Sequence, residues 1–276
     1  MIFRKFSLFH LSLIPIKEPN FETLRHISRA DWLRLALSRP FSFPYLKNED
    51  LFWVPQPDVD CLIVGIIEKR QSRLQHLPPE QGGAEVSRPE WQGAYIIVDP
   101  DHHADGQKMA VENDIVGMPN SLVRYLAKYL NSLQDRPFES EPSQIFDSND
   151  YFNFMKTNGS KLEYVKFHFV VPNMWNTSGN LDSELKKTRD ETGTEQVDMT
   201  FKSRRGLDGN SKRVVEGVEY AARGAGSVRA KSVNGAKYSS KRSASQTSVE
   251  IPTDQEHEEE QRNWISNLRN RILGRE

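Results

Sequence analysis

The sequence has almost no cysteine: Cys61 is the single one among 276 residues. One thiol excludes a disulfide within the chain and any zinc site built from cysteines alone. Cys61 opens a short apolar run at residues 61–64, so we expect a buried thiol. A catalytic thiol would need a lowered pKa and access to solvent. The scarcity of cysteine fits a reducing compartment, and we expect a cytoplasmic protein.

Long apolar runs and the common catalytic signatures are also missing. No run approaches the roughly 18 apolar residues of a membrane helix, so no membrane span is expected. The phosphate-binding, dinucleotide-binding, serine-hydrolase and zinc-protease motifs do not occur. No motif therefore identifies a reaction, and we expect a protein without catalytic activity or cofactor of its own.

The apolar residues that are present predict strands mixed with helices. Residues 6–14 alternate two apolar rows, which is typical of a strand buried on both faces. Further strands are expected at residues 60–68, 93–99 and 161–171, with residues 108–113 as an antiparallel partner. Helices are expected after Pro119 and at residues 181–192. This order predicts an α+β fold with mixed or antiparallel sheets.

The same pass along the chain predicts two α+β domains, residues 1–133 and 134–276. The second would contain a basic region at residues 202–242 and a C-terminal amphipathic helix at residues 255–273. The boundary is expected near residues 131–149, and a single large domain is the alternative.

The basic region is the most unusual stretch of the sequence. Residues 202–242 contain eleven Lys and Arg against three acids, 11 − 3 = +8, in a chain whose net charge is −1. Such a local field attracts polyanions, and we expect it to bind nucleic acid, in particular DNA. The expected contacts are Arg204, Arg205, Lys212, Arg213, Arg229, Lys231, Lys237, Tyr238, Lys241 and Arg242.

Within this region Asn234-Gly235 predicts a hairpin with a two-residue type I′ turn. The register that follows pairs Val233 with Ala236, Lys231 with Tyr238, and Arg229 with Ser240. Arg229, Lys231 and Tyr238 would then share one face, with Lys237 and Lys241 on the other. Tyr238 would be free to stack on an unpaired base. Three other interpretations are protection of a sheet edge, neutralisation by the acidic run at residues 254–260, and contact with another acidic partner.

A second candidate site follows the strand at residues 93–99. Asp99, Asp101, His102 and His103 combine carboxylates with imidazoles, which could hold Mg²⁺ or Mn²⁺ and activate water. The alternative function is therefore a metal-dependent nuclease or phosphoesterase. A polar hairpin turn is the structural interpretation of the same residues.

The C-terminal helix has one apolar stripe, formed by Trp264, Ile265, Leu268 and Ile272. We expect this stripe to pack onto its own domain. The alternative is that it contacts a second subunit or another protein, which would make the chain a protein-partner interaction module.

Two stretches together resemble a known group of proteins in their hydrophobic layout. These are AYIIVDPDHHADGQKMAVEN, followed by a Leu-rich helix, and KLEYVKFHFVVPN. The layout is similar to that of prokaryotic phage-exclusion and phage-defence proteins, namely the lambda exclusion-sensor type and the DNA-binding component of Kiwa-like systems. The resemblance implies a cytoplasmic, oligomeric, DNA-binding protein that acts in or regulates anti-phage defence. It covers about 80 residues and assigns no functional residue.

Overall fold

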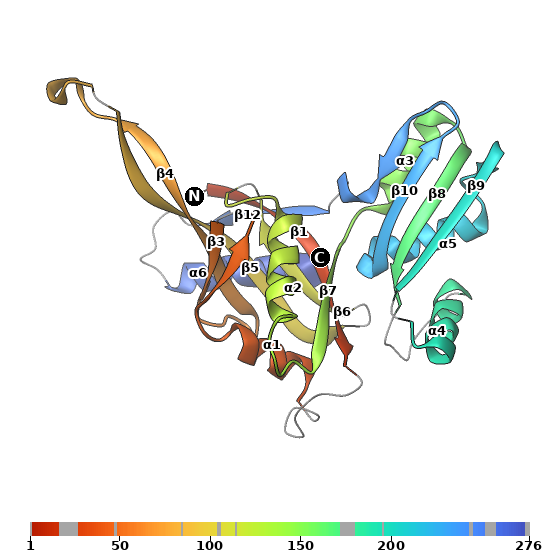
Figure 1. Cartoon of the computed structure of the whole chain (residues 1–276), viewed down its shortest axis with the longest axis horizontal. Coiled ribbons are helices and arrows are strands. Elements are labelled where there is room, and N and C mark those ends of the chain that lie inside the picture. Colours follow the sequence, from red (N-terminus) through yellow and green to blue (C-terminus); the bar gives the residue numbers. More distant parts are fainter. Residues whose placement is uncertain are drawn as a thin grey trace.

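The computed structural model describes residues 2–16, 27–46, 49–83, 85–103, 106–113, 115–171, 180–194, 196–242, 245–251 and 258–273. These residues form an α+β structure with one eight-stranded and one four-stranded sheet, as the sequence predicts. Figure 1 shows the two sheets side by side, each with its own helices. None of the described helices is long and apolar enough to cross a membrane.

The first sheet is antiparallel along its whole path. Its strand order is β12-β1-β6-β5-β4-β3-β2, and β7 also pairs with β1. The strands are β1 (Ile2–Pro15), β2 (Phe41–Tyr45), β3 (Glu49–Pro55), β4 (Ile63–His76), β5 (Glu85–His103), β6 (Gly106–Glu112), β7 (Phe138–Gln144) and β12 (Gln246–Ile251). Beyond the pairings with β3 and β6, β4 and β5 continue as a two-stranded arm that leaves the body of the sheet (Figure 1).

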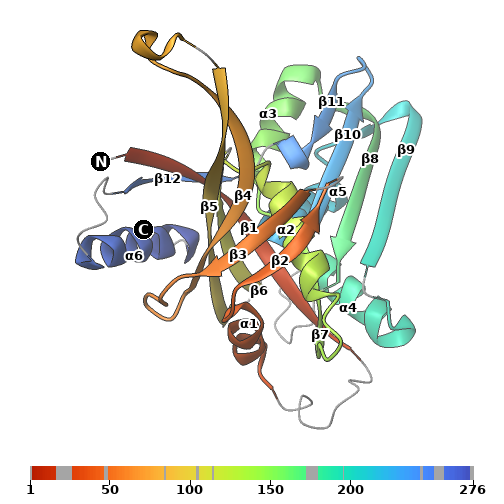
Figure 2. The same ribbon diagram turned by 60° about the vertical axis from the view of Figure 1, so that its left-hand side comes forward.

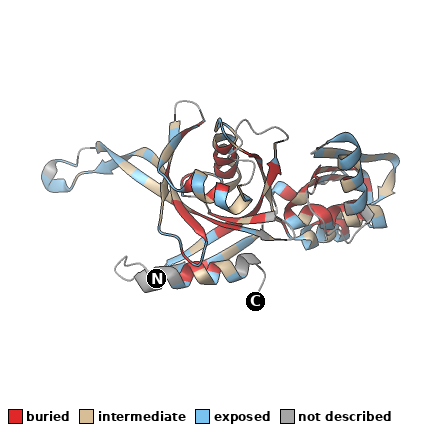
Figure 3. Cartoon of the chain, turned by 90° about the horizontal axis from the view of Figure 1, so that it is seen from below, coloured by how far each residue is buried: buried red, intermediate tan, exposed pale blue. Residues whose placement is uncertain are grey.

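Both faces of this sheet are covered by helices. Helices α1 (Arg29–Leu37) and α2 (Pro119–Leu130) pack on one face, and α6 (Glu258–Leu273) packs on the other. Strand β1 supplies Phe9 and Leu11 to the first core and Phe6 and Leu8 to the second. The predicted strand with two apolar faces is thus confirmed, and Figure 3 shows the buried residues along the middle of the sheet.

The second sheet has the order β11-β10-β8-β9 (Figure 2). Its strands are β8 (Lys161–Val170), β9 (Gln196–Asp208), β10 (Gly226–Ser232) and β11 (Lys237–Ser239). Helices α3 (Ser148–Asn158), α4 (Asn180–Thr192) and α5 (Lys212–Tyr220) contribute to the apolar core on one face. Helix α5 lies so close to Phe167 that a Cβ on Gly217 would come within 2.9 Å of the ring.

The sheets divide the chain differently from the expected boundary at residues 133 and 134. Strand β7 pairs with β1, and β12 pairs with β1 as well, so both belong to the first sheet. The second unit therefore consists of residues 146–242, inserted between β7 and β12. Sequence composition did not predict this insertion. Strands β1, β7 and β12 pair although they lie far apart in the sequence, and such pairing leaves no local pattern where the inserted unit begins or ends.

Cys61 is exposed, so the prediction of a buried thiol is wrong. Asp60 and Cys61 both have positive φ, 50° and 65°, and they form a turn ahead of β4. The strand begins at Ile63, two residues later than the apolar run. The side chain of Cys61 therefore lies outside the alternation that buries the residues after it.

The C-terminal helix packs onto the first sheet. Trp264, Ile265 and Leu268 are 4%, 4% and 0% exposed. The indole of Trp264 stacks on Phe6 at 6.1 Å between ring centroids and meets the ring of Tyr95 edge-on at 5.3 Å. These three side chains are not available to a partner, so the partner surface predicted there is wrong for them. The side chain of Ile272 lies outside the described residues.

The docking of α6 can be tested by truncating its central side chain. Trp264→Ala should lower the free energy of unfolding by about 3–5 kcal/mol, because it removes a buried ring and leaves a cavity. Urea denaturation followed by circular dichroism measures the change. Asn263→Ala, exposed on the same helix, should change it by less than about 0.5 kcal/mol. Similar values for the two variants would contradict the packing described here.

Candidate nucleic-acid interface

The β10–β11 hairpin has a register one residue away from the predicted one. Arg229 pairs with Ser239, Ala230 with Tyr238, and Lys231 with Lys237. The turn is longer than expected: the Ser232 amide donates to the Ala236 carbonyl at 2.9 Å, and the Gly235 amide donates to the Ser232 carbonyl at 2.9 Å. Residues 233–235 are thus a three-residue loop with Gly235 at φ 93°. The predicted two-residue turn is wrong.

This shift moves Tyr238 to the opposite face of the hairpin. Tyr238 is 7% exposed and packs against Tyr151 and Phe154, each with 5.5 Å between ring centroids. It cannot stack on a nucleic-acid base, so this predicted contact is wrong. The same shift places Lys237 on the outer face with Arg229 and Lys231.

The outer face of the second sheet is not covered by any of the described helices. Its cross-strand rows join Arg229 to Lys166 and Thr200, and Lys231 to Tyr164 and Lys202. We call this surface the open face. Its residues are Tyr164, Lys166 and His168 of β8, Asp198, Thr200 and Lys202 of β9, Ser227, Arg229 and Lys231 of β10, and Lys237 of β11.

Two carboxylates neutralise part of the charge on this surface. Glu163 accepts from the Lys231 ammonium at 2.5 Å, which raises the pKa of Lys231. Asp198 accepts from Lys166 at 2.8 Å and lies 2.8 Å from His168 Nδ1. These two partners, Lys166 foremost, lower the pKa of Asp198. Arg229, Lys202 and Lys237 have no carboxylate partner among the residues that the structure describes.

The other predicted contacts are spread over the second unit. Arg204 and Arg205 are exposed in a bulge of β9, where residues 203–206 lie opposite Glu163. Lys241 is exposed in the short helix η4 (Ser240–Arg242), beside the open face. For Arg242 the structure describes the backbone but not the side chain.

Lys212 and Arg213 do not share a surface with the open face. Both belong to α5, on the helix-covered side of the sheet. Arg213 donates to Glu184 of α4 at 2.6 Å, so part of its charge serves helix packing. The ten predicted contact residues therefore do not lie on a single surface of the structure.

Sequence reasoning missed Tyr164, Lys166 and Lys202 as members of the surface. Tyr164 and Lys166 precede the basic region, on a strand identified by its apolar residues. The alternation of β8 was the available signal: it places Tyr164, Lys166 and His168 on the face opposite Val165, Phe167 and Phe169.

The Asp99 cluster is engaged by the chain itself. Asp99 is 2% exposed; it accepts from the Asp101 amide at 3.1 Å and lies 3.1 Å from His103 Nε2. Arg269 of α6 approaches Asp99 to 4.0 Å and Asp101 to 3.8 Å. In the described part of the chain no three His, Cys, Asp or Glu side chains are grouped to hold a metal ion. The His102 side chain lies outside that part. These contacts favour a structural role for the cluster at the end of β5.

No protein-family model, curated protein or solved structure matches this chain.

The ion pairs of the open face make a prediction about Asp198. Its pKa should lie below the ordinary value of about 3.9, and Lys166→Ala should raise it, because the ammonium favours the ionised carboxylate. The pKa of Asp198 is lower in the folded state than in the unfolded state. The interaction therefore stabilises the fold at pH values above the unfolded-state pKa. That contribution is lost as the pH falls through the folded-state pKa.

An NMR titration of the Asp198 carboxyl carbon measures this pKa. Lys161→Ala is the matched control, because Lys161 is an exposed lysine on the same strand, near its other end. The control should leave the titration of Asp198 unchanged. A Lys166→Ala variant with the parent pKa would show that the pair does not persist in solution.

Proposed function

We propose that this protein binds nucleic acid through the open face of its second sheet. The layout resemblance to phage-exclusion and phage-defence proteins suggests that this binding serves anti-phage defence. The observation that supports the binding most directly is the arrangement of Arg229, Lys202 and Arg204, which face solvent around Tyr164 without carboxylate partners among the described residues. Ammonium and guanidinium groups spaced over one surface are suited to the phosphates of a nucleic-acid backbone.

Protection of sheet edges explains only part of this charge. In the order β11-β10-β8-β9, the edge strands are β9 and β11, and Lys202 and Lys237 lie on them. Lysine on an edge strand opposes pairing with another chain. Arg229 and Lys166 lie on the two inner strands, whose hydrogen-bonding edges are already paired. Their presence favours a ligand over edge protection.

The positive charge could also be neutralised by the acidic run at residues 254–260, without any ligand. Residues 252–257 lie outside the described part of the chain. Helix α6, which begins at Glu258, packs on the first sheet through Trp264 and Leu268. The described contacts of α6 are with the first sheet, which does not support this explanation.

The proposal predicts a specific loss of binding. Arg229→Ala combined with Lys202→Ala should weaken nucleic-acid binding and flatten its dependence on salt, because two phosphate contacts and their released counterions are lost. In a plot of log K against log salt, the slope should fall by about 0.7–0.9 for each contact. Fluorescence anisotropy with labelled DNA and RNA at several salt concentrations measures both quantities.

The matched control changes the same net charge on the helix-covered side. Lys187→Ala combined with Lys212→Ala removes two exposed lysines from α4 and α5. This variant should bind with nearly the parent affinity and slope. Equal losses in the two variants would indicate a nonspecific charge effect. Parent-like binding by a folded Arg229/Lys202 variant would refute the open face as the binding surface.

A further inference from the structure

Three neighbouring hollows extend from the open face to the junction of the two units. The outermost is lined by Lys202 and Arg204 and shares Lys166 and Arg229 with the middle one. The middle hollow shares His168, Ser227 and Lys241 with the third, a cavity of about 510 Å³ between the two sheets. Because neighbouring hollows share lining residues, the three lie in a row, and we call this row the basic groove. It begins on the second sheet and ends against α2 of the first unit.

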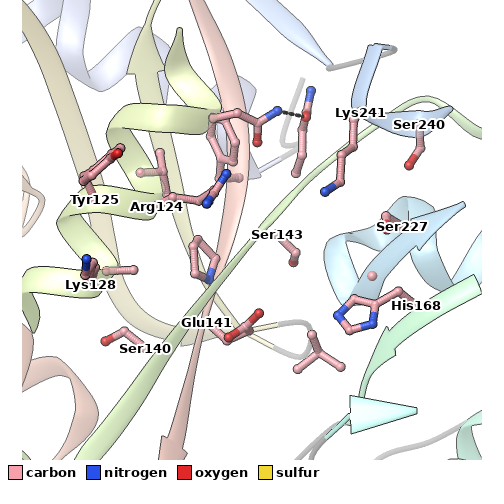
Figure 4. A pocket seen from close by; sticks show the side chains of 18 of the residues that line it. Arg124, Tyr125, Lys128, Ser140, Glu141, Ser143, His168, Ser227, Ser240 and Lys241 are labelled. Atoms are coloured by element: carbon pink, nitrogen blue, oxygen red, sulfur yellow. Dashed lines mark hydrogen bonds between the residues drawn. The ribbon is translucent and has the colours of Figure 1, made fainter. Parts of the chain in front are cut away.

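The inner end of the groove is formed by both units. Figure 4 shows Arg124, Tyr125 and Lys128 of α2 on one side, and His168, Ser227 and Lys241 on the other. The walls are held together by the hydroxyl of Ser143, which donates to the carbonyl of Gly224. The backbone of Gly224 also lies directly against the ring of His10 on β1. The groove therefore crosses a packed junction.

The inner end has the chemistry of an anion site. Arg124, Lys128 and Lys241 are exposed, and none has a carboxylate partner among the described residues. Among the described residues that line this 510 Å³ cavity, Glu141 is the single carboxylate. The hydroxyl of Ser140 is buried, lines the cavity and has no hydrogen-bond partner in the described part of the chain. The cavity thus has positive charges on both walls and a hydroxyl donor in its lining, which suits the phosphates of a nucleic-acid backbone.

Tyr164 indicates which form of nucleic acid fits the groove. Its ring is partly exposed on the open face, between Lys231 and Lys202, and no aromatic partner for it occurs among the described residues. An aromatic ring on a sheet surface can stack on a base only where that base is unpaired. A duplex presents its phosphates and groove edges and keeps its base faces stacked.

We propose that the basic groove binds a single strand of nucleic acid, with a base on Tyr164 and the backbone continuing to Arg124 and Lys128. This inference rests on the proposed function and specifies its ligand. The open face contributes Lys202 and Arg229, and the bulge of β9 beside it contributes Arg204. Lys241 and, from the first unit, Arg124 and Lys128 contribute the remaining phosphate contacts. Short strands occupy the sheet alone, whereas longer strands also reach α2.

The first test compares strands with duplexes on the full-length protein. Labelled oligo(dT) and oligo(U) of about 20 nucleotides and a duplex of equal length are titrated by fluorescence anisotropy. Both single strands, or one of them if the groove distinguishes the sugars, should bind about tenfold tighter than the duplex. Tyr164→Ala should weaken single-strand binding about tenfold and leave duplex binding unchanged. A duplex that binds as tightly as either strand overturns the inference.

The second test concerns the reach to α2. Arg124→Ala combined with Lys128→Ala should weaken binding of the 20-nucleotide strand about tenfold and reduce its salt slope by about 1.4. Binding of a strand of about five nucleotides should stay unchanged, because it occupies the sheet alone. Lys5→Ala combined with Arg39→Ala removes the same charge from exposed positions of the first unit that line none of the three hollows, and should have no effect.

The outcomes separate the two proposals. If Arg229→Ala with Lys202→Ala weakens binding but the α2 pair behaves like its control, the open face stands and the extended path is refuted. If the open-face pair weakens strands and duplexes equally, nucleic-acid binding stands and the single-strand inference is refuted. If neither pair changes the binding of any nucleic acid, both proposals are refuted.

Discussion

The burial of one side of β8 is the constraint on which the second unit depends. Phe167 and Phe169 are fully buried under the helices and stack on each other at 5.2 Å between ring centroids. Because side chains alternate along a strand, burying these rings turns Tyr164, Lys166 and His168 to the other side. Pairing with β9 and β10 then extends both faces across the sheet. The basic surface is thus a consequence of where the apolar core lies.

The junction between the units depends on a close backbone approach. Gly224 has φ 87°, and a Cβ at this position would lie 1.8 Å from the ring of His10 on β1. A side chain would therefore force the second unit away from the first sheet. With glycine there, the turn after α5 meets β1 and β7, and α2 comes to lie at the end of the open face. The chain also passes between the units twice, after β7 and before β12, which limits how far they can separate.

The charge excess of residues 202–242 is a poor guide to which residues act together. Lys212 and Arg213 lie on a helix on the covered side, and Tyr238 is in the core. Lys166 comes from outside the excess, and Arg124 and Lys128 come from another unit altogether. Charge along a sequence measures a local field, whereas a binding surface is defined by which side chains face the same solvent. The fold converts one into the other through strand alternation and packing.

The sequence by itself determined the α+β class, the strand with two apolar faces at β1, the helix that begins at Pro119 and the apolar positions Trp264, Ile265 and Leu268 of α6. These features depend on periodicities and caps within about ten residues, which are readable along the chain. Only the tertiary structure decided the register of β10 and β11, because two-residue and three-residue turns differ by one hydrogen bond and share the same Asn-Gly signal. The inserted position of the second unit and the groove at its junction were also decided there. They depend on contacts such as the one between Ser143 and Gly224, which are 81 residues apart. A pattern within a short stretch of sequence cannot predict such a contact.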